Sequence, residues 1–92
     1  MDVFEAAYRV AHDFEGGATG LAQKLGRNAG TFLNKVNPAM DSHLLGLGET
    51  IEMQVVAKDY RILYAYAATL SHICIPAGDY TGDTDMGLLE AF

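Results

Sequence analysis

Hydrophobic residues recur at helical spacing through residues 2–15 and predict an amphipathic helix there. The apolar side chains are three or four positions apart, which places them on one stripe, while charged and polar side chains lie on the other faces. The stripe consists of Val3, Ala7, Val10 and Phe14. Gly16 and Gly17 then end the helix.

Residues 18–38 predict two short helices joined by a tight turn. Gly26 can adopt the left-handed conformation that ends a helix and reverses the chain. Asn28 is a favourable N-cap for the second helix, which ends near Asn37 because the residue before Pro38 is displaced from the helical conformation. The first helix carries a short apolar stripe of Leu21, Ala22 and Leu25. This spacing fits a helix-turn-helix, in which a small residue lies where the second helix approaches.

The second short helix can face the core in two registers. Counting from Gly26 places Phe32 inward, with Val36 on the same stripe four residues later. Turning Leu33 inward instead would rotate the outer residues by one position. In the first register the outer surface consists of Ala29, Gly30, Thr31, Asn34 and Lys35. The sequence leaves both registers open.

A fourth helix is predicted from residue 47 to about residue 56. Its hydrophobic residues are four positions apart, and Glu49 and Glu52 lie near its start, where the helix dipole favours negative charge. The spaced residues are Leu47, Ile51 and Val55. Because the chain has no alternating pattern long enough for a sheet, we expect an all-α fold, a compact bundle of about five helices.

Asp59 is expected to cap a fifth helix over residues 60–71, which is apolar nearly all round. Arg61 is its only charged residue. A helix of this kind lies in a core or in a subunit interface, and in a small protein its two faces can serve both. We therefore expect a homodimer or a higher oligomer. The expected interface residues are Ile62, Tyr66, Leu70 and Ile73.

The chain of 92 residues suffices for one domain with a modest core. After Pro76 its character changes, because the remaining residues are rich in glycine and carry four carboxylates. We expect a helical domain over residues 1–75 and an irregular, acidic tail over residues 76–92.

Charge is distributed unevenly along the chain. The formal net charge is -6, and the field of such a molecule as a whole repels phosphate. Residues 16–40, however, carry three cations and no carboxylate. Because salt screens charges over about 10 Å, the attraction of these cations for a nearby phosphate can exceed the repulsion from distant carboxylates. The three cations are Lys24, Arg27 and Lys35.

The sequence does not indicate a membrane protein, a metalloprotein or an enzyme. No apolar run approaches the roughly 18 residues of a membrane span, and no signal-peptide pattern follows Met1, so we expect a cytoplasmic protein. Cys74 is the single cysteine, and with His72 it makes only half of a metal site. Because nucleotide loops, phosphate loops and nucleophile elbows are missing, we expect no catalysis, cofactor or small-molecule substrate.

Five short motifs carry a resemblance to a known family. They are Leu21-Ala22, Leu25-Gly26, Lys35-Val36-Asn37-Pro38, Ser42-His43-Leu44 and Asp59-Tyr60-Arg61-Ile62-Leu63. In these residues the chain resembles the phage CII-type regulatory proteins of temperate phages and bacterial prophages, over roughly residues 3–76. The resemblance implies a bacterial or phage transcription regulator, located in the bacterial cytoplasm, that binds double-stranded DNA through a lambda-repressor-like helix-turn-helix within residues 1–75.

The resemblance makes residues 28–37 the recognition helix, which lies in the major groove with its first turns toward the bases. Asn34 can bond adenine bidentately, Lys35 can reach guanine or phosphate, and Thr31 can meet thymine or phosphate. The family commonly carries a basic or polar residue at the position of Leu33, so the DNA face of this chain is less polar. The expected phosphate contacts are Lys24, Arg27 and the backbone N–H groups of Thr19 and Asn28.

The small number of cations bears on how the protein would bind DNA. Sequence-independent affinity grows with the number of phosphates neutralised, and one protomer offers three cations in this region. Two copies on symmetric half-sites about 34–36 Å apart would double that number. The competing interpretation is an acidic helical protein-interaction module, similar to an antirepressor, which does not bind DNA. The net negative charge favours the module, and the local cations favour the regulator.

Overall fold

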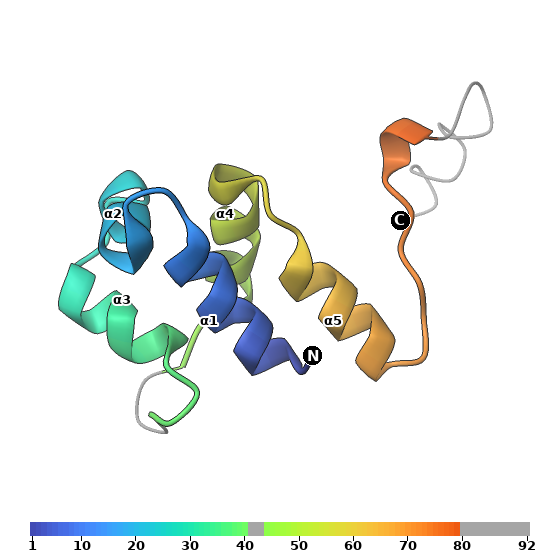
Figure 1. The fold of residues 1–92 in the computed structure, drawn as a ribbon, viewed down its shortest axis with the longest axis horizontal. Helices are drawn as coiled ribbons and strands as arrows, with labels where there is room; N and C mark the ends of the chain where they lie inside the picture. Colours follow the sequence, from blue (N-terminus) through green and yellow to red (C-terminus); the bar gives the residue numbers. More distant parts are fainter. Residues whose placement is uncertain (41–43, 80–92) are drawn as a thin grey trace.

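The computed structural model describes residues 1–40 and 44–79. Within these ranges the chain forms five α-helices, one short 3-10 turn and no strand (Figure 1). The helices are α1 Val3–Asp13, α2 Gly17–Lys24, α3 Ala29–Val36, α4 Leu47–Ala57 and α5 Arg61–Thr69, and the turn η1 is Ala77–Asp79. The predicted all-α bundle of about five helices is confirmed. His43 and most of the predicted tail lie outside the described residues.

α1 lies at the centre of the bundle and packs against each of the other four helices (Figure 1). The side chain of Asp2 begins this helix, because its Oδ1 accepts the backbone N–H groups of Phe4 at 2.6 Å and Glu5 at 3.1 Å. The buried side chains are small, which lets the neighbouring helices approach closely. They are Ala6, Ala7, Val10 and Ala11. The amphipathic helix predicted for residues 2–15 is therefore confirmed.

α2 and α3 meet at the turn predicted from Gly26. This residue has a φ of +68°, and its N–H donates to the carbonyl of Gln23 at 3.1 Å. The N–H of Arg27 donates to the carbonyl of Ala22 at 2.9 Å, which completes the pattern of a helix that ends at a left-handed glycine. The reversed chain lets α2 and α3 pack against each other.

The core lies where α1, α4 and α5 meet the pair formed by α2 and α3. Phe32 and Val36 of α3 point into it and are almost fully buried, whereas Leu33 is half-buried at its edge. The register that turns Phe32 inward is therefore the correct one. The largest fully buried side chains are Phe32, Leu21, Met53, Val10 and Val36.

α4 forms where it was predicted, but its hydrophobic stripe faces solvent. Leu47, Ile51 and Val55 are 79%, 62% and 63% exposed. The buried residue of this helix is Met53, which belongs to the core. The spacing of hydrophobic residues thus predicts the helix but not its buried face. The buried face is the one that contacts α1 and α2, and the sequence of α4 does not specify where those helices lie.

α5 packs along α1 through Ile62 and Ala65. Asp59 precedes this helix, and its Oδ1 accepts the backbone N–H of Arg61 at 3.3 Å. Asp59 therefore satisfies a donor at the start of α5, as predicted, although Tyr60 occupies the N-cap position itself.

The segment after α5 turns back at Ser71, which has a φ of +60° (Figure 1). An apolar groove of about 350 Å³ lies between residues 74–77 and the start of α5. Tyr64 of α5 lines this groove, and Cys74 is half-buried in the opposite wall. None of the described helices is both long and apolar enough to cross a membrane.

Candidate nucleic-acid interface

The outward surface of α3 carries two of the polar residues predicted to face DNA. Because Phe32 and Val36 point into the core, the period of 3.6 residues places Asn34 on the opposite side of the helix and Thr31 beside it. The Thr31 side chain is exposed and that of Asn34 is half-buried. The packing of α3 therefore presents a short polar surface to solvent.

Asn28 is the N-cap of α3, as the sequence predicts. Its Oδ1 accepts the backbone N–H of Thr31 at 3.0 Å, which satisfies one donor of the first turn. The other first-turn N–H groups of a helix have no partner within the helix and are available to an anion. A contact of Asn28 with DNA would thus involve its backbone, because its side-chain oxygen is engaged in the cap.

Lys35 of α3 is bonded to a carboxylate of α4. Its Nζ lies 3.1 Å from Oε1 and 3.1 Å from Oε2 of Glu49. The Lys35 side chain is 26% exposed and that of Glu49 is 12% exposed, so this ion pair is partly shielded from water. The ammonium group of Lys35 therefore lies toward α4 rather than over the outer surface of α3.

Arg27, in the turn before α3, is also paired with carboxylates of α4. Its Nη2 lies 2.6 Å from Oε1 of Glu52, and its Nη1 lies 3.7 Å from Oε2 of Glu49. Both cations that flank the exposed surface of α3 thus have an acidic partner on α4. The sequence places Glu49 and Glu52 at the start of a helix but gives no signal that they meet Arg27 and Lys35.

Glu49 is held in place from several directions. Burial alone would raise its pKa, but the backbone N–H of Gly46, the Lys35 ammonium and the charge of Arg27 outweigh burial and hold the pKa below its ordinary value. The Gly46 N–H donates to Oε1 at 2.9 Å, so Glu49 also satisfies a donor at the start of α4. Glu49 is therefore ionised at neutral pH and fixed to the beginning of its helix.

These groups surround a small polar hollow of about 210 Å³. The hollow lies between α3, with the turn before it, and the start of α4. Its lining consists of Arg27, Asn28, Thr31, Phe32, Lys35 and Glu49. The structure thus brings four of the seven predicted DNA contacts together, with Asn34 on the adjoining outer side of α3.

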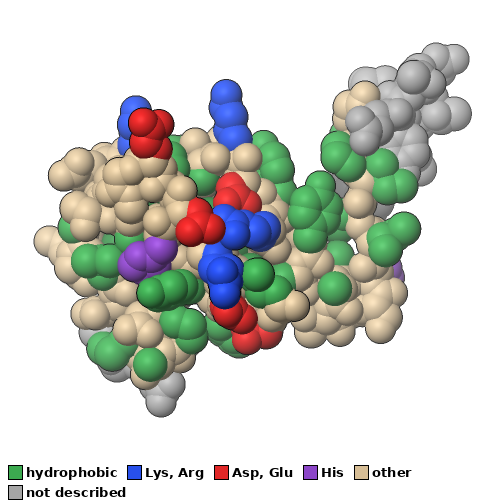
Figure 2. Space-filling view, in the orientation of Figure 1, with side chains coloured by type: hydrophobic (Ala, Val, Ile, Leu, Met, Phe, Trp, Pro, Cys, Tyr) green, Lys and Arg blue, Asp and Glu red, His purple; other side chains and the backbone are tan. Residues whose placement is uncertain are grey.

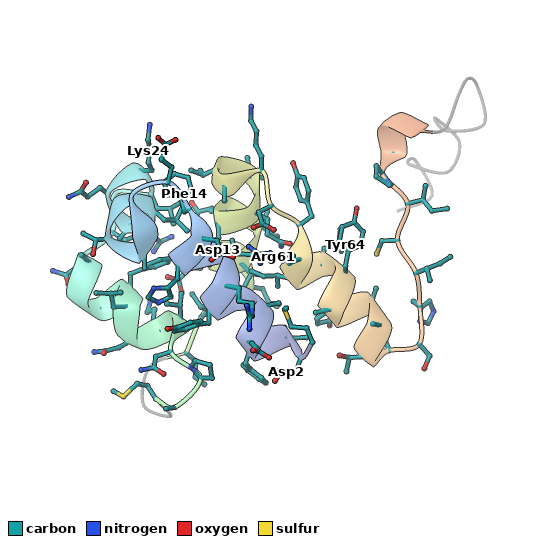
Figure 3. The ribbon with its side chains drawn as sticks, viewed as in Figure 1. Asp2, Asp13, Phe14, Lys24, Arg61 and Tyr64 are labelled. Carbon is teal, nitrogen blue, oxygen red and sulfur yellow. The ribbon has the colours of Figure 1, made fainter. Side chains whose placement is uncertain are left out.

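The remaining two predicted DNA contacts lie on α2, outside the hollow. Lys24 is in the last turn of α2 and projects away from the helical body (Figure 3). Within residues 1–40 and 44–79 it forms no ion pair. Thr19 is exposed in the first turn of α2. Lys24 is therefore the cation of residues 16–40 that does not have a carboxylate partner among the described residues.

Charge elsewhere on the molecule is mixed. Figure 2 shows a band of adjacent basic and acidic side chains down the middle of the view, over α1 and the start of α5. Arg9 pairs with Glu5, and Arg61 pairs with Asp13 and Asp59. Carboxylates neutralise these cations, as they do Arg27 and Lys35, but the band lacks the outward polar side chains that Thr31 and Asn34 give α3.

The predicted dimer-interface residues divide between the core and the surface. Ile62 is 4% exposed and packs in the core that α5 shares with α1, so this burial corrects its assignment to an interface. Tyr66, Leu70 and Ile73 are exposed. The sequence could not separate the two groups, because α5 is apolar on nearly every face.

Comparison with known proteins gives a family. No curated protein and no solved structure gave a significant match to this chain. The sequence does match the family described as phage regulatory protein CII (CP76), over residues 2–92. This range includes the motifs on which the resemblance to CII-type proteins was based, and all five described helices. The chain therefore belongs to the phage regulatory protein CII (CP76) family.

Proposed function

We propose that this protein is a sequence-specific, double-stranded-DNA-binding regulator of phage transcription. Its membership of a family of phage regulatory proteins implies a role in transcription regulation. The observation that carries the DNA-binding part is the orientation of α3, which turns Thr31 and Asn34 away from the core. In this proposal α2 and α3 form a helix-turn-helix, and α3 lies in the major groove.

The proposed contacts have separate roles. Asn34 reads adenine through its amide, and Thr31 meets a thymine methyl group or a phosphate. Lys24 and the first-turn N–H groups at Thr19 and Asn28 hold phosphates. Arg27 and Lys35 reach phosphate, or guanine in the case of Lys35, when they leave their partners on α4.

We further propose that two copies bind DNA together. A single protomer offers few cations, because Arg27 and Lys35 are paired with carboxylates of the same chain. A dimer would place two α3 helices on half-sites about 34–36 Å apart. The exposed side chains of Tyr66, Leu70 and Ile73 supply the proposed interface.

A second candidate function, binding another protein without DNA, is favoured by the exposed stripe of α4. Leu47, Ile51 and Val55 lie on one side of this helix and are mostly open to solvent. Exposed apolar surfaces that cluster in this way mark interaction sites in many proteins. Under this alternative, the ion pairs of Arg27 and Lys35 are purely structural.

Titration of a labelled nonspecific duplex at two salt concentrations distinguishes the two candidates. The DNA-binding regulator shows salt-sensitive binding, because each neutralised phosphate releases counterions. Selection from random duplexes then yields a site with two symmetric halves one helical turn apart. Absence of binding to the nonspecific duplex even at low salt, together with failure to select any duplex from the random pool, would reject the regulator and favour the protein-interaction module.

A further inference from the structure

The two carboxylates of α4 occupy the same hydrogen-bond donors that a DNA phosphate would use. Glu49 engages the Lys35 ammonium through both of its oxygens, each at 3.1 Å. Glu52 engages Nη2 of Arg27 at 2.6 Å. We propose that Glu49 and Glu52 are internal competitors of DNA phosphate that limit sequence-independent binding. This inference rests on the proposed function, because it concerns the same α3 surface.

The competition follows from the chemistry of the contacts. Carboxylate and phosphate oxygens both accept charge-assisted hydrogen bonds from lysine and arginine, so each cation serves one or the other. The Lys35–Glu49 pair is partly shielded from water, which makes its attraction stronger than that of a fully exposed pair. A phosphate must therefore displace a carboxylate that is already in contact, rather than water.

The competitor is fixed and the cation is movable. Glu49 also accepts the backbone N–H of Gly46 at 2.9 Å, so it remains part of the start of α4 when Lys35 leaves. Lys35 can leave by rotation of its long side chain, without movement of α3. Release of Lys35 thus has the cost of one ion pair and does not require the fold to open.

The consequence is a low effective charge on the DNA-binding face. Of the three cations in residues 16–40, two have carboxylate partners in the folded protein, and Lys24 has none among the described residues. Sequence-independent binding depends on the number of cations that neutralise phosphates. Glu49 and Glu52 thereby weaken binding to random DNA, because α3 makes no specific base contacts there that would offset the loss of the two ion pairs.

The test measures binding of a nonspecific duplex by the full chain at 50 mM and 200 mM salt. Glu49→Gln frees Lys35, and Glu49→Gln/Glu52→Gln frees Arg27 as well. Each freed cation steepens the salt slope by about 0.9, which enlarges the fall in affinity over this range by about 3.5-fold for the single variant and about 12-fold for the double variant. We expect both variants to bind more tightly than wild type at 50 mM salt.

A matched control separates the loss of competition from the loss of negative charge. Glu5→Gln on α1 also removes one carboxylate and one ion pair, that with Arg9, which is not a predicted DNA contact. Circular dichroism checks that each variant folds. Because Glu49 helps to start α4, its replacement could affect folding, so Glu52→Gln serves as a second single variant. The wild-type Glu52 side chain is half-exposed and pairs with Arg27 alone among the described residues.

Two failures can be told apart. If wild type binds the duplex and the variants of α4 bind no more tightly than Glu5→Gln, or with an unchanged salt slope, the internal competition is refuted and the proposed function stands. If neither wild type nor any variant binds the duplex at the lowest salt, the proposed function is refuted and the competition with it.

Discussion

Arg61, at the start of α5, lies 2.9 Å from Asp13, at the end of α1, and this ion pair ties the two helices together (Figure 3). The same guanidinium bonds Asp59 at 2.6 Å. The hydrogen bonds to Asp59 and then to Asp13 raise the pKa of Arg61 above its ordinary value. Arg61 therefore joins three parts of the fold: the end of α1, the loop before α5 and α5 itself.

We expect Arg61→Ala to lower the free energy of unfolding by about 1 kcal/mol, because it removes a partly exposed pair of contacts rather than a fully buried one. Urea denaturation followed by circular dichroism measures the change. Arg9→Ala is the matched control, since Arg9 pairs with Glu5 one turn away on the solvent-facing side of α1 and should contribute about 0.3–0.5 kcal/mol. Equal losses in the two variants would contradict the linking role of Arg61.

The free energy of unfolding should decrease at acidic pH, because two carboxylates that form ion pairs, Asp59 and Glu49, become protonated. The hydrogen bond from Arg61 lowers the pKa of Asp59, and the pKa of Glu49 is also lowered, because its bonds and nearby cations outweigh burial. When the folded pKa lies below the unfolded one, the contribution is present above about pH 4 and is lost as the pH falls through the folded value. Denaturation between pH 7 and pH 3 should show this loss, less steeply for Asp59→Asn. An Asp59→Asn variant with the acid sensitivity of wild type would contradict the assignment.

Gly26→Ala should destabilise the protein by about 1–2 kcal/mol because of backbone strain alone, since a residue with a side chain disfavours a φ of +68°. A Cβ at this position would meet no atom within 4 Å, so steric overlap is not the cause. Gly48→Ala on α4 is the control, because its Cβ also meets nothing and alanine favours helices by about 0.5–1 kcal/mol. Thermal unfolding should therefore shift down for the first variant and up for the second.

Asn34→Ala should weaken binding to a selected operator by about 1–3 kcal/mol and relax the preference at one base pair, because it removes the proposed bidentate contact with adenine. Lys35→Ala should weaken operator binding less selectively, across sequences. The helical circular dichroism should not change in either variant. Thr69→Ala, at the end of α5, is the control, since among the described residues the Thr69 hydroxyl donates only to the carbonyl of Ala65 within its own helix. Unchanged operator binding by both α3 variants would remove the assignment of α3.

Leu70→Glu should shift the protein from dimer to monomer, because it places a charge in the proposed α5 interface. Size-exclusion chromatography with light scattering measures the mass. Ile51→Glu is the matched control, since Ile51 is similarly exposed but lies on α4. Dissociation by Ile51→Glu and not by Leu70→Glu would move the interface to α4.

The sequence by itself determined the helices and their ends. Gly26, Asn28 and Pro38 act on backbone groups within one turn of themselves, so their effects do not depend on distant parts of the chain. The family likewise follows from short motifs. These features are local, and local chemistry is visible in the order of residues.

Only the tertiary structure decided which faces are covered and which charges meet. Leu47, Ile51 and Val55 have the spacing of a core stripe but face solvent, because α4 meets the bundle through Met53. Ile62 is buried while the equally apolar Leu70 is not. The pairing of Lys35 with Glu49 joins residues 14 positions apart on different helices. Burial and long-range ion pairs depend on how the helices are placed in space, and the hydrophobic periodicity within one helix does not specify that placement.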